Sequence, residues 1–206
     1  MYKLMKNVCV FAASSSMVPE AYTDAACETG ALLAENGLTL IFGAGAVGLM
    51  GAAAQGAKAQ DGEIIGIIPK LLNQPGIPFL KCSRLIEVED MPARKNLMIK
   101  MSDAYIVLAG GFGTFDELFE VLTLKQLAYI NVPIVIVNTE GYYDNLLKQL
   151  QVCVSEGFIN RRYLSLFTVV DTPSDAIDYI LQYKREDFPD KISEAAFKYQ
   201  TRGMNE

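Results

Sequence analysis

Short apolar runs alternate with segments of helical periodicity along most of the chain. The runs are rich in Val, Ile and Leu, which favours strands at 7–12, 38–42, 63–68, 84–88, 104–109, 132–137 and 167–170. Between them, apolar residues recur every three or four positions, which predicts helices at 19–36, 49–60, 91–102, 114–129, 142–155 and 174–183. Pro19 suits the first turn of the first helix, and Gly37 suits its end.

The predicted strands are mostly continuous apolar runs rather than alternating ones. Continuous runs are typical of a parallel sheet buried on both faces, and strand–helix alternation is typical of a doubly wound α/β fold. We therefore expect a single Rossmann-like domain with a mainly parallel sheet over residues 1–185. A charged tail follows at 186–206, with room for one short helix near 192–199. Ligands of such folds bind beyond the carboxyl ends of the strands.

Composition narrows the classes of function. About half of the 206 residues are hydrophobic, which is enough for one core. The formal net charge of -6 argues against binding to a nucleic-acid backbone, which usually requires a basic face. No apolar run reaches the length of about 18 residues that a membrane span needs, and the first residues show no signal-peptide cleavage pattern. We expect a cytoplasmic protein that binds neither nucleic acid nor membranes.

Cysteine and histidine usage narrows the chemistry. The four cysteines are widely spaced and mostly lie in apolar surroundings, so we expect reduced core cysteines and no metal site: Cys9, Cys27, Cys82 and Cys153. The chain has no histidine, which excludes Ser–His–Asp and Cys–His catalysis and imidazole metal ligands. Any catalysis must therefore come from carboxylates, Arg, Lys, Tyr, backbone dipoles or a cofactor.

A glycine-rich turn carries the strongest chemical signal. The sequence AGGFGTFDE at 109–117 follows a predicted buried strand and precedes a predicted helix. That geometry presents backbone N–H groups and the positive end of a helix dipole to an anion. The residues expected to hold a phosphate are Gly110, Gly111, Gly113 and Thr114. Asp116 and Glu117 place two carboxylates beside it, although acids in a first turn also stabilise any helix by about 0.3–1 kcal/mol.

A second glycine cluster, GAGAVG at 43–48, matches the G-x-G-x-x-G pattern of dinucleotide-binding proteins. It follows the second predicted strand rather than the first, and Glu63, the acid in the expected range, precedes its strand instead of ending it. Both features argue against a dinucleotide site. We expect close approach of a nucleotide or sugar phosphate, with Gly45 among the contacts; the alternative is a tight turn with close helix–sheet packing.

Two further clusters have both a functional and a structural interpretation. The serines at 14–16 follow the first strand, where hydroxyls bind a base or phosphate or cap the next helix. Arg94 and Lys95 lie near the start of a predicted helix, where the dipole disfavours cations. They indicate an anionic ligand, since arginine suits phosphate and carboxylate. The alternative is an exposed helix face or a salt bridge with Glu89 or Asp90.

Together these motifs resemble those of the LOG family, cytokinin riboside 5′-monophosphate phosphoribohydrolases that also carry a lysine decarboxylase-like label. The similarity rests on GGFGTFDE at 110–117, RKNLM at 94–98 and GAGAVGLMG at 43–51, and it extends over about residues 7–183. The resemblance implies a Rossmann-like homodimer that needs no cofactor. It also implies hydrolysis of the N-glycosidic bond of a nucleoside 5′-monophosphate to a free adenine-type base and ribose 5-phosphate.

The resemblance gives individual residues their roles. Glu117 matches the family's catalytic acid, and Arg94 matches its catalytic arginine. The phosphate-binding turn corresponds to Gly111, Gly113 and Thr114, and Ser15 corresponds to a small hydroxyl residue after the first strand. By these roles Glu117 stabilises positive charge on the ribose and orients the attacking water. Arg94 fixes the phosphate or ribose, Lys95 is a further substrate contact, and Asp116 binds ribose hydroxyls.

The chain departs from the family pattern at several small residues. Alanine replaces the family's proline or glycine at Ala12, Ala13, Ala44 and Ala109, and Asp116 stands where glutamate is common. These changes bear on pocket size and substrate preference more than on the type of reaction. The decarboxylase label is disfavoured, because a pyridoxal phosphate enzyme needs a Schiff-base lysine with an acidic partner for the pyridinium nitrogen.

Two alternatives remain open from the sequence. One is a non-catalytic nucleotide-binding or carrier protein, which the same fold and glycine turn would serve. The other is a nucleosidase that acts on AMP or another nucleoside monophosphate. The presence of both Arg94 and Glu117 favours an enzyme over a carrier.

Overall fold

A seven-stranded parallel sheet forms the centre of the protein. The computed structural model describes residues 6–184. The strands are β1 (Asn7–Phe11), β2 (Thr39–Phe42), β3 (Ile64–Pro69), β4 (Arg84–Val88), β5 (Ala104–Val107), β6 (Ile134–Val137) and β7 (Thr168–Val170). Their order is β4-β3-β2-β1-β5-β6-β7, and every neighbouring pair is parallel. The predicted α/β Rossmann-like fold is confirmed.

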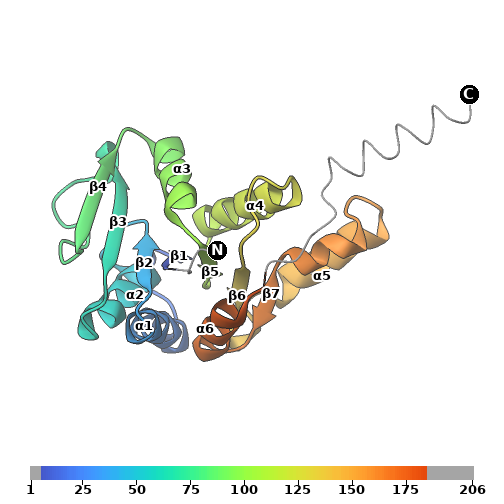
Figure 1. Cartoon of the computed structure of the whole chain (residues 1–206), viewed down its shortest axis with the longest axis horizontal. Helices are drawn as coiled ribbons and strands as arrows, with labels where there is room; N and C mark the ends of the chain where they lie inside the picture. The colour runs from blue at the N-terminus through green and yellow to red at the C-terminus, as the bar shows by residue number, and fades with distance from the viewer. Residues whose placement is uncertain (1–5, 185–206) are drawn as a thin grey trace, which may run out of the picture.

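Helices cover both faces of the sheet. They are α1 (Glu20–Glu35), α2 (Gly48–Ala59), α3 (Met91–Met101), α4 (Phe112–Gln126), α5 (Asp144–Ser155) and α6 (Pro173–Gln182), with short 3-10 turns at Lys70–Leu72, Thr139–Gly141 and Arg161–Leu166. One core packs α1, α2 and α6 against the sheet, and a second core packs α3, α4 and α5 against the other face (Figure 1). The strands are buried on both sides, which explains their continuous apolar sequences.

The predicted elements all occur, with bounds shifted by one or a few residues. The largest shift at a functional position is at α4, which begins at Phe112 instead of 114. Pro19 is the N-cap of α1 rather than part of its first turn. The predicted domain limit at 185 and the tail at 186–206 lie at and beyond the end of the described residues.

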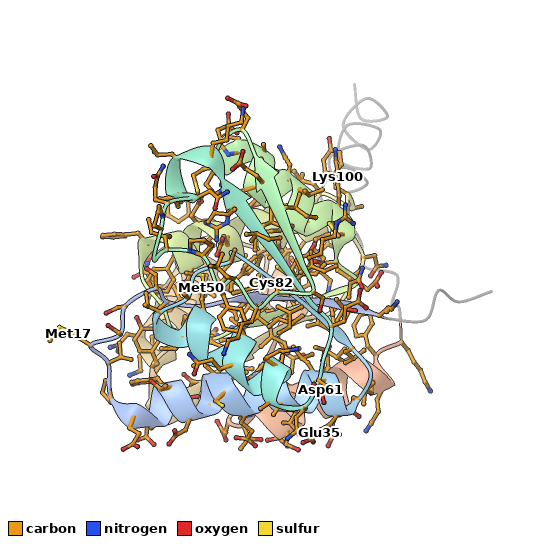
Figure 2. The ribbon with its side chains drawn as sticks, turned by 90° about the vertical axis from the view of Figure 1, so that its left-hand side faces the viewer. Met17, Glu35, Met50, Asp61, Cys82 and Lys100 are labelled. Atoms are coloured by element: carbon orange, nitrogen blue, oxygen red, sulfur yellow. The ribbon has the colours of Figure 1, made fainter. Side chains whose placement is uncertain are left out.

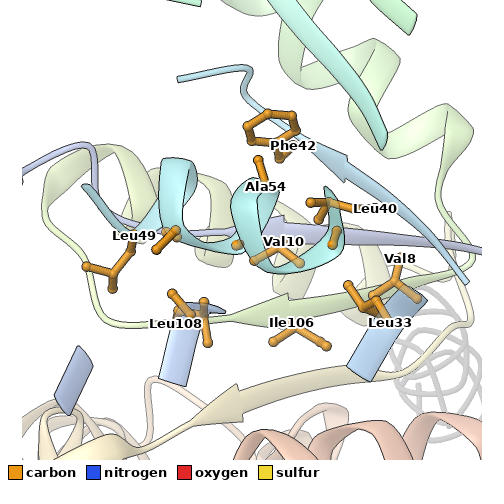
Figure 3. Packing of buried hydrophobic residues seen from close by; sticks show 14 of the residues in the cluster. Val8, Val10, Leu33, Leu40, Phe42, Leu49, Ala54, Ile106 and Leu108 are labelled. Carbon is orange, nitrogen blue, oxygen red and sulfur yellow. The ribbon is translucent and has the colours of Figure 1, made fainter. Parts of the chain in front are cut away.

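Helices α1 and α2 pack unusually closely, and glycines make this possible. A Cβ on Gly30 would lie 1.8 Å from the carbonyl oxygen of Ala53, and one on Gly56 would lie 1.9 Å from that of Cys27. Such distances are far below any van der Waals contact, so only glycine fits at either position. In the same core, Ala54 of α2 lies next to Phe42 of β2 (Figure 3).

The cysteines correct one expectation. Only Cys9 is buried, whereas Cys27 is exposed and Cys82 and Cys153 are half-buried; all four are free thiols. Cys27 faces solvent on α1, because the close approach to α2 involves its backbone rather than its side chain. None of the helices in the described part of the chain is long and apolar enough to cross a membrane.

The strand order places the site. From β1 the chain winds outward through β2, β3 and β4, then returns to β5 on the other side of β1. Ligands of doubly wound sheets bind at such a reversal point, beyond the carboxyl ends of the two central strands. Here the segments after β1 and β5 are joined by a hydrogen bond from the Ala13 N–H to the Ala109 carbonyl, 3.1 Å long.

Candidate active site

A cavity of about 300 Å³ lies at this reversal point. That volume is within the range of small-molecule sites. Its walls come from the segment after β1, the first turn of α2, the N-terminal half of α3 and the first turns of α4. The lining residues are Ala12, Ala13, Ser14, Ser15, Met50, Met91, Arg94, Gly111, Phe112, Gly113, Thr114, Asp116 and Glu117. Met50 is on the α2 side, and Met17 projects from the loop after β1 into solvent (Figure 2).

The N-terminus of α4 opens into the cavity. Gly111 is the N-cap, and no side chain caps the helix there. The first four N–H groups of a helix have no partner within it, so those of residues 111–114 are available to a ligand. A Cβ on Gly111 or Gly113 would meet no atom within 4 Å, which means that the space in front of them is open. Gly110 differs: its missing side chain makes room for the buried Thr114.

The carbonyl groups of the same turn are already occupied. The Tyr143 hydroxyl donates to the Leu108 carbonyl and the Tyr142 hydroxyl to the Gly110 carbonyl, each at 2.7 Å. The Ala109 carbonyl accepts from Ala13, and the Gly111 carbonyl accepts from Phe115. With its acceptors engaged and its donors open, the turn favours an anion. Sequence reasoning missed the two tyrosines, because no local signal links them to a turn more than 30 residues away.

Arg94 and Glu117 form a buried pair in the wall of the cavity. Nη2 of Arg94 lies 3.5 Å from Oε1 of Glu117, and the two side chains are only 9% and 10% exposed. Arg94 is in the second turn of α3, whose start is fixed by Asp90 accepting the Ala93 N–H at 2.8 Å. Nε of Arg94 has no hydrogen-bond partner among the described residues. A buried donor without a partner is costly, so this guanidinium is suited to a polar ligand.

The electrostatics of the site centre on Glu117. Burial raises the pKa of this carboxyl from an ordinary value of 4.5 to about 7; Arg94 opposes the rise, and Asp116 adds to it. A carboxyl that titrates near neutrality in a cleft is typical of catalytic groups. It can exchange a proton with water, and when ionised it places negative charge at a largely buried position in the cavity wall.

Lys95 and Asp116 form a second pair between the same helices. Nζ of Lys95 lies 2.8 Å from Asp116 and 2.9 Å from Glu120 of α4. The hydrogen bond with Asp116 raises the pKa of Lys95. Lys95 therefore forms salt bridges, as one alternative predicted, but with other partners. Asp90 caps α3 and does not pair with Lys95. Lys95 does not line the cavity, so its predicted substrate contact finds no support in this geometry.

The serines after β1 are exposed, and Ser14 and Ser15 line the cavity. The alternative in which they cap α1 is wrong, because the cap position is Pro19 and receives no side-chain hydrogen bond. Gly48, in the left-handed region with φ +64°, packs directly on them. A Cβ there would lie 2.5 Å from the backbone of Ser14, so the second glycine cluster holds the serine loop in place.

The rest of the second glycine cluster lies behind the cavity rather than in its lining. Gly45 forms a β-bridge with Pro78, and its predicted ligand contact has no counterpart in the cavity wall. Glu63 accepts a hydrogen bond from the Thr39 hydroxyl at 3.0 Å, at the amino end of the sheet. Glu63 at the amino end of the sheet cannot bind a ribose beyond the carboxyl ends of the strands, which agrees with the prediction that GAGAVG at 43–48 is not a dinucleotide site. Ala44, in the same cluster, adopts φ +60°, a conformation that costs a side-chain-bearing residue roughly 1 kcal/mol or more.

Comparison with known proteins agrees with this geometry. A family model described as "Possible lysine decarboxylase" matches residues 50–180. Cytokinin riboside 5′-monophosphate phosphoribohydrolase LOG1 of Arabidopsis thaliana is 41% identical over 155 residues, covering 75% of this chain and 73% of its own length. LOG5 of the same plant, with the same activity in its name, is 36% identical over 179 residues, covering 87% of this chain and 78% of its own.

Solved structures share the fold. The molybdenum cofactor carrier protein of Chlamydomonas reinhardtii superimposes with a TM-score of 0.66 at 23% identity, covering 86% of this chain and 97% of that one. The molybdenum cofactor binding protein of Rippkaea orientalis gives 0.64 at 24% identity, over 87% and 96%. The fold and the site define a Rossmann-like α/β protein in which an uncapped helix N-terminus lies beside a buried carboxyl. The chain belongs to the LOG, or lysine decarboxylase-like, family.

Proposed function

We propose that the protein hydrolyses the N-glycosidic bond of a nucleoside 5′-monophosphate, releasing the free base and ribose 5-phosphate. The names of its relatives support this reaction. The observation that carries it is the buried Arg94–Glu117 pair, which lies beside the open N-terminus of α4 in one cavity. The same names support an N6-modified adenine as the base, with AMP as the alternative substrate.

The phosphate is assigned to the N-terminus of α4. Backbone N–H groups of Gly111, Gly113 and Thr114 would donate to its oxygens, aided by the helix dipole. The open space in front of the two glycines supports this assignment. Because no side chain caps the helix, the ligand does not have to displace an existing contact.

Glu117 is assigned to the reacting carbon. Cleavage of an N-glycosidic bond passes through an oxocarbenium-like state, in which the ribose gains positive charge. An ionised carboxylate in a buried site stabilises that charge strongly, and it also orients the attacking water. Arg94, which lines the same cavity, would hold the phosphate or a ribose oxygen and so fix the sugar relative to Glu117. Asp116, bound to Lys95 through Oδ2, keeps Oδ1 for a ribose hydroxyl.

Lysine decarboxylation receives no support from the site. A Schiff-base lysine must reach its neutral form, and such lysines have lowered pKa values. The two carboxylates around Lys95 raise its pKa and stabilise the ammonium ion instead. Lys95 also lies outside the cavity lining.

Base release tests the proposal. Purified protein is incubated with AMP and, separately, with N6-isopentenyl-AMP, and the free base is measured by chromatography. Glu117→Gln should lower kcat by roughly 10²–10⁴-fold, because the neutral amide cannot stabilise the cationic ribose. Calorimetry should still detect nucleotide binding by this variant. The ratio of the two wild-type rates gives the substrate preference.

Two results would contradict the proposal. A Glu117→Gln enzyme with wild-type turnover would remove Glu117 from the mechanism. Saturable nucleotide binding with no base release from either nucleotide would favour the carrier alternative.

A further inference from the structure

Gly43 directly follows β2, and the proposed function gives it no task. The structure shows what occupies the space where its side chain would be. A Cβ on Gly43 would lie 1.7 Å from Nη2, 2.6 Å from Cζ and 3.1 Å from Nε of Arg94. The three nearest atoms all belong to this one side chain, so the guanidinium of Arg94 fills the position of a missing methyl group.

We infer that Gly43 is a positioning residue: the absence of its side chain creates the seat that holds the Arg94 guanidinium against Glu117. The atom that a Cβ would displace most is Nη2, which is also the atom that contacts Oε1 of Glu117 at 3.5 Å. Any side chain at 43 therefore moves the contact itself. The catalytic consequence rests on the proposed function, whereas the seat is a property of the fold.

Backbone conformation does not explain this glycine. Gly48, in the same cluster, has a positive φ, but Gly43 is outside the left-handed region, so alanine can adopt its backbone without strain. The requirement at 43 is for space alone. Because the obstructing atoms are the end of a flexible side chain, Gly43→Ala should move Arg94 and leave the sheet in place.

The first test follows Glu117 directly and needs no turnover. The charged groups that act on Glu117 are Arg94 and Lys95 from α3 and Asp116 and Glu120 from α4, and the Cys9 thiol of β1 is also close. Among these, Arg94 is the main group that lowers the pKa of Glu117. We expect Gly43→Ala to raise that pKa above about 7, measured by carboxyl-carbon NMR titration with Glu117→Gln identifying the signal.

A double-mutant cycle separates the seat from a general structural effect. Arg94→Ala should raise the pKa of Glu117 as well, and Gly43→Ala should add nothing in the Arg94→Ala background. Gly62→Ala is the control: its Cβ would lie 2.5 Å from the Ala34 Cβ, at the amino edge of the sheet, far from the pair. It should cost stability without moving the pKa of Glu117.

Folding gives a second criterion. If Gly43→Ala is unstable, Gly43→Ala/Arg94→Ala should restore a cooperative thermal transition, because the obstructed side chain is gone. An unchanged Glu117 pKa in folded Gly43→Ala would overturn the inference. So would a double variant that stays unfolded, or additive effects of the two substitutions on the pKa.

Turnover gives the last criterion. With the proposed function, Gly43→Ala should lower kcat by about 10²-fold, since misplacement of a positioning group by 1 Å can have that effect. The rise of activity with pH should shift to higher pH together with the pKa of Glu117. An enzyme that releases no base at all would contradict the proposed function, yet the NMR cycle would still decide the role of Gly43.

Discussion

Burial and a neighbouring arginine have opposite effects on the pKa of Glu117, and together they bring it to about 7. Burial disfavours its charged form more strongly than Arg94, 3.5 Å away, favours it, so its pKa rises to about 7. The fold holds this carboxyl where its ionised form is costly, which is a common property of catalytic groups. Stability and function therefore depend on the protonation state of the same residue.

The cost of ionising Glu117 in the folded protein should appear in the pH dependence of the free energy of unfolding. An acid with a raised folded-state pKa binds its proton more tightly when folded, so its contribution is present at low pH and lost as pH rises from about 4.5 to about 7. Relative to Glu117→Gln, the wild type should lose roughly 2–3 kcal/mol of unfolding free energy between pH 5 and pH 8. Urea denaturation at both pH values measures this difference.

The comparison between the two proteins cancels pH effects from other groups. Glu28→Gln, an exposed carboxyl on α1, serves as the matched control and should show the same pH dependence as the wild type. An identical difference between wild type and Glu117→Gln at both pH values would mean that Glu117 is not perturbed.

At the scale of elements, ion pairs join helices α3 and α4. Consecutive residues of α3 point to different surroundings: Arg94 faces the cavity and Glu117, and Lys95 faces the outer carboxylates of α4. Met98, one turn later, is buried in the core. The RKNLM motif at 94–98 thus combines a cation that lines the cavity, an interhelical salt bridge and a packing residue. The glycine turn precedes α4, and Tyr142 and Tyr143 hold it in place by donating hydrogen bonds to its carbonyl groups.

The packing of α1 on α2 gives a prediction at this scale. Gly30→Ala should lower the unfolding free energy by roughly 1–3 kcal/mol, because its Cβ would lie 1.8 Å from a backbone oxygen that cannot move alone. This penalty outweighs the gain in helix propensity of about 1 kcal/mol. Chemical denaturation checks it, with Glu28→Ala on the exposed face of α1 expected to stay within about 0.5 kcal/mol of the wild type. A more stable Gly30→Ala protein would mean that the helices separate easily.

At the scale of the whole molecule, the order of strands decides which loops meet. The segments after β1 and β5 are about 95 residues apart in the chain, yet Ala13 and Ala109 are hydrogen-bonded neighbours. The doubly wound order creates this junction, and the cavity lies at it. The segment after β4 supplies Arg94 on α3, and the segment after β6 supplies Tyr142 and Tyr143, which directly precede α5.

The family resemblance leads us to expect a homodimer. Light scattering coupled to size-exclusion chromatography should give about twice the chain mass of 22.6 kDa, with a mass that falls toward that of one chain on dilution if the affinity is weak. A single-chain mass across the whole concentration range would contradict a dimer.

The sequence alone determined the fold class and the motifs of the candidate site. Continuous apolar runs, helical periodicity and terminating glycines are local properties, and they specified the elements and the turn at 109–117. Tertiary structure decided the rest. It alone placed Lys95 among carboxylates, Gly43 beneath Arg94 and Tyr142 on the glycine turn. These relations depend on how helices pack across a sheet, and the desolvation that raises the pKa of Glu117 exists only when that packing is complete.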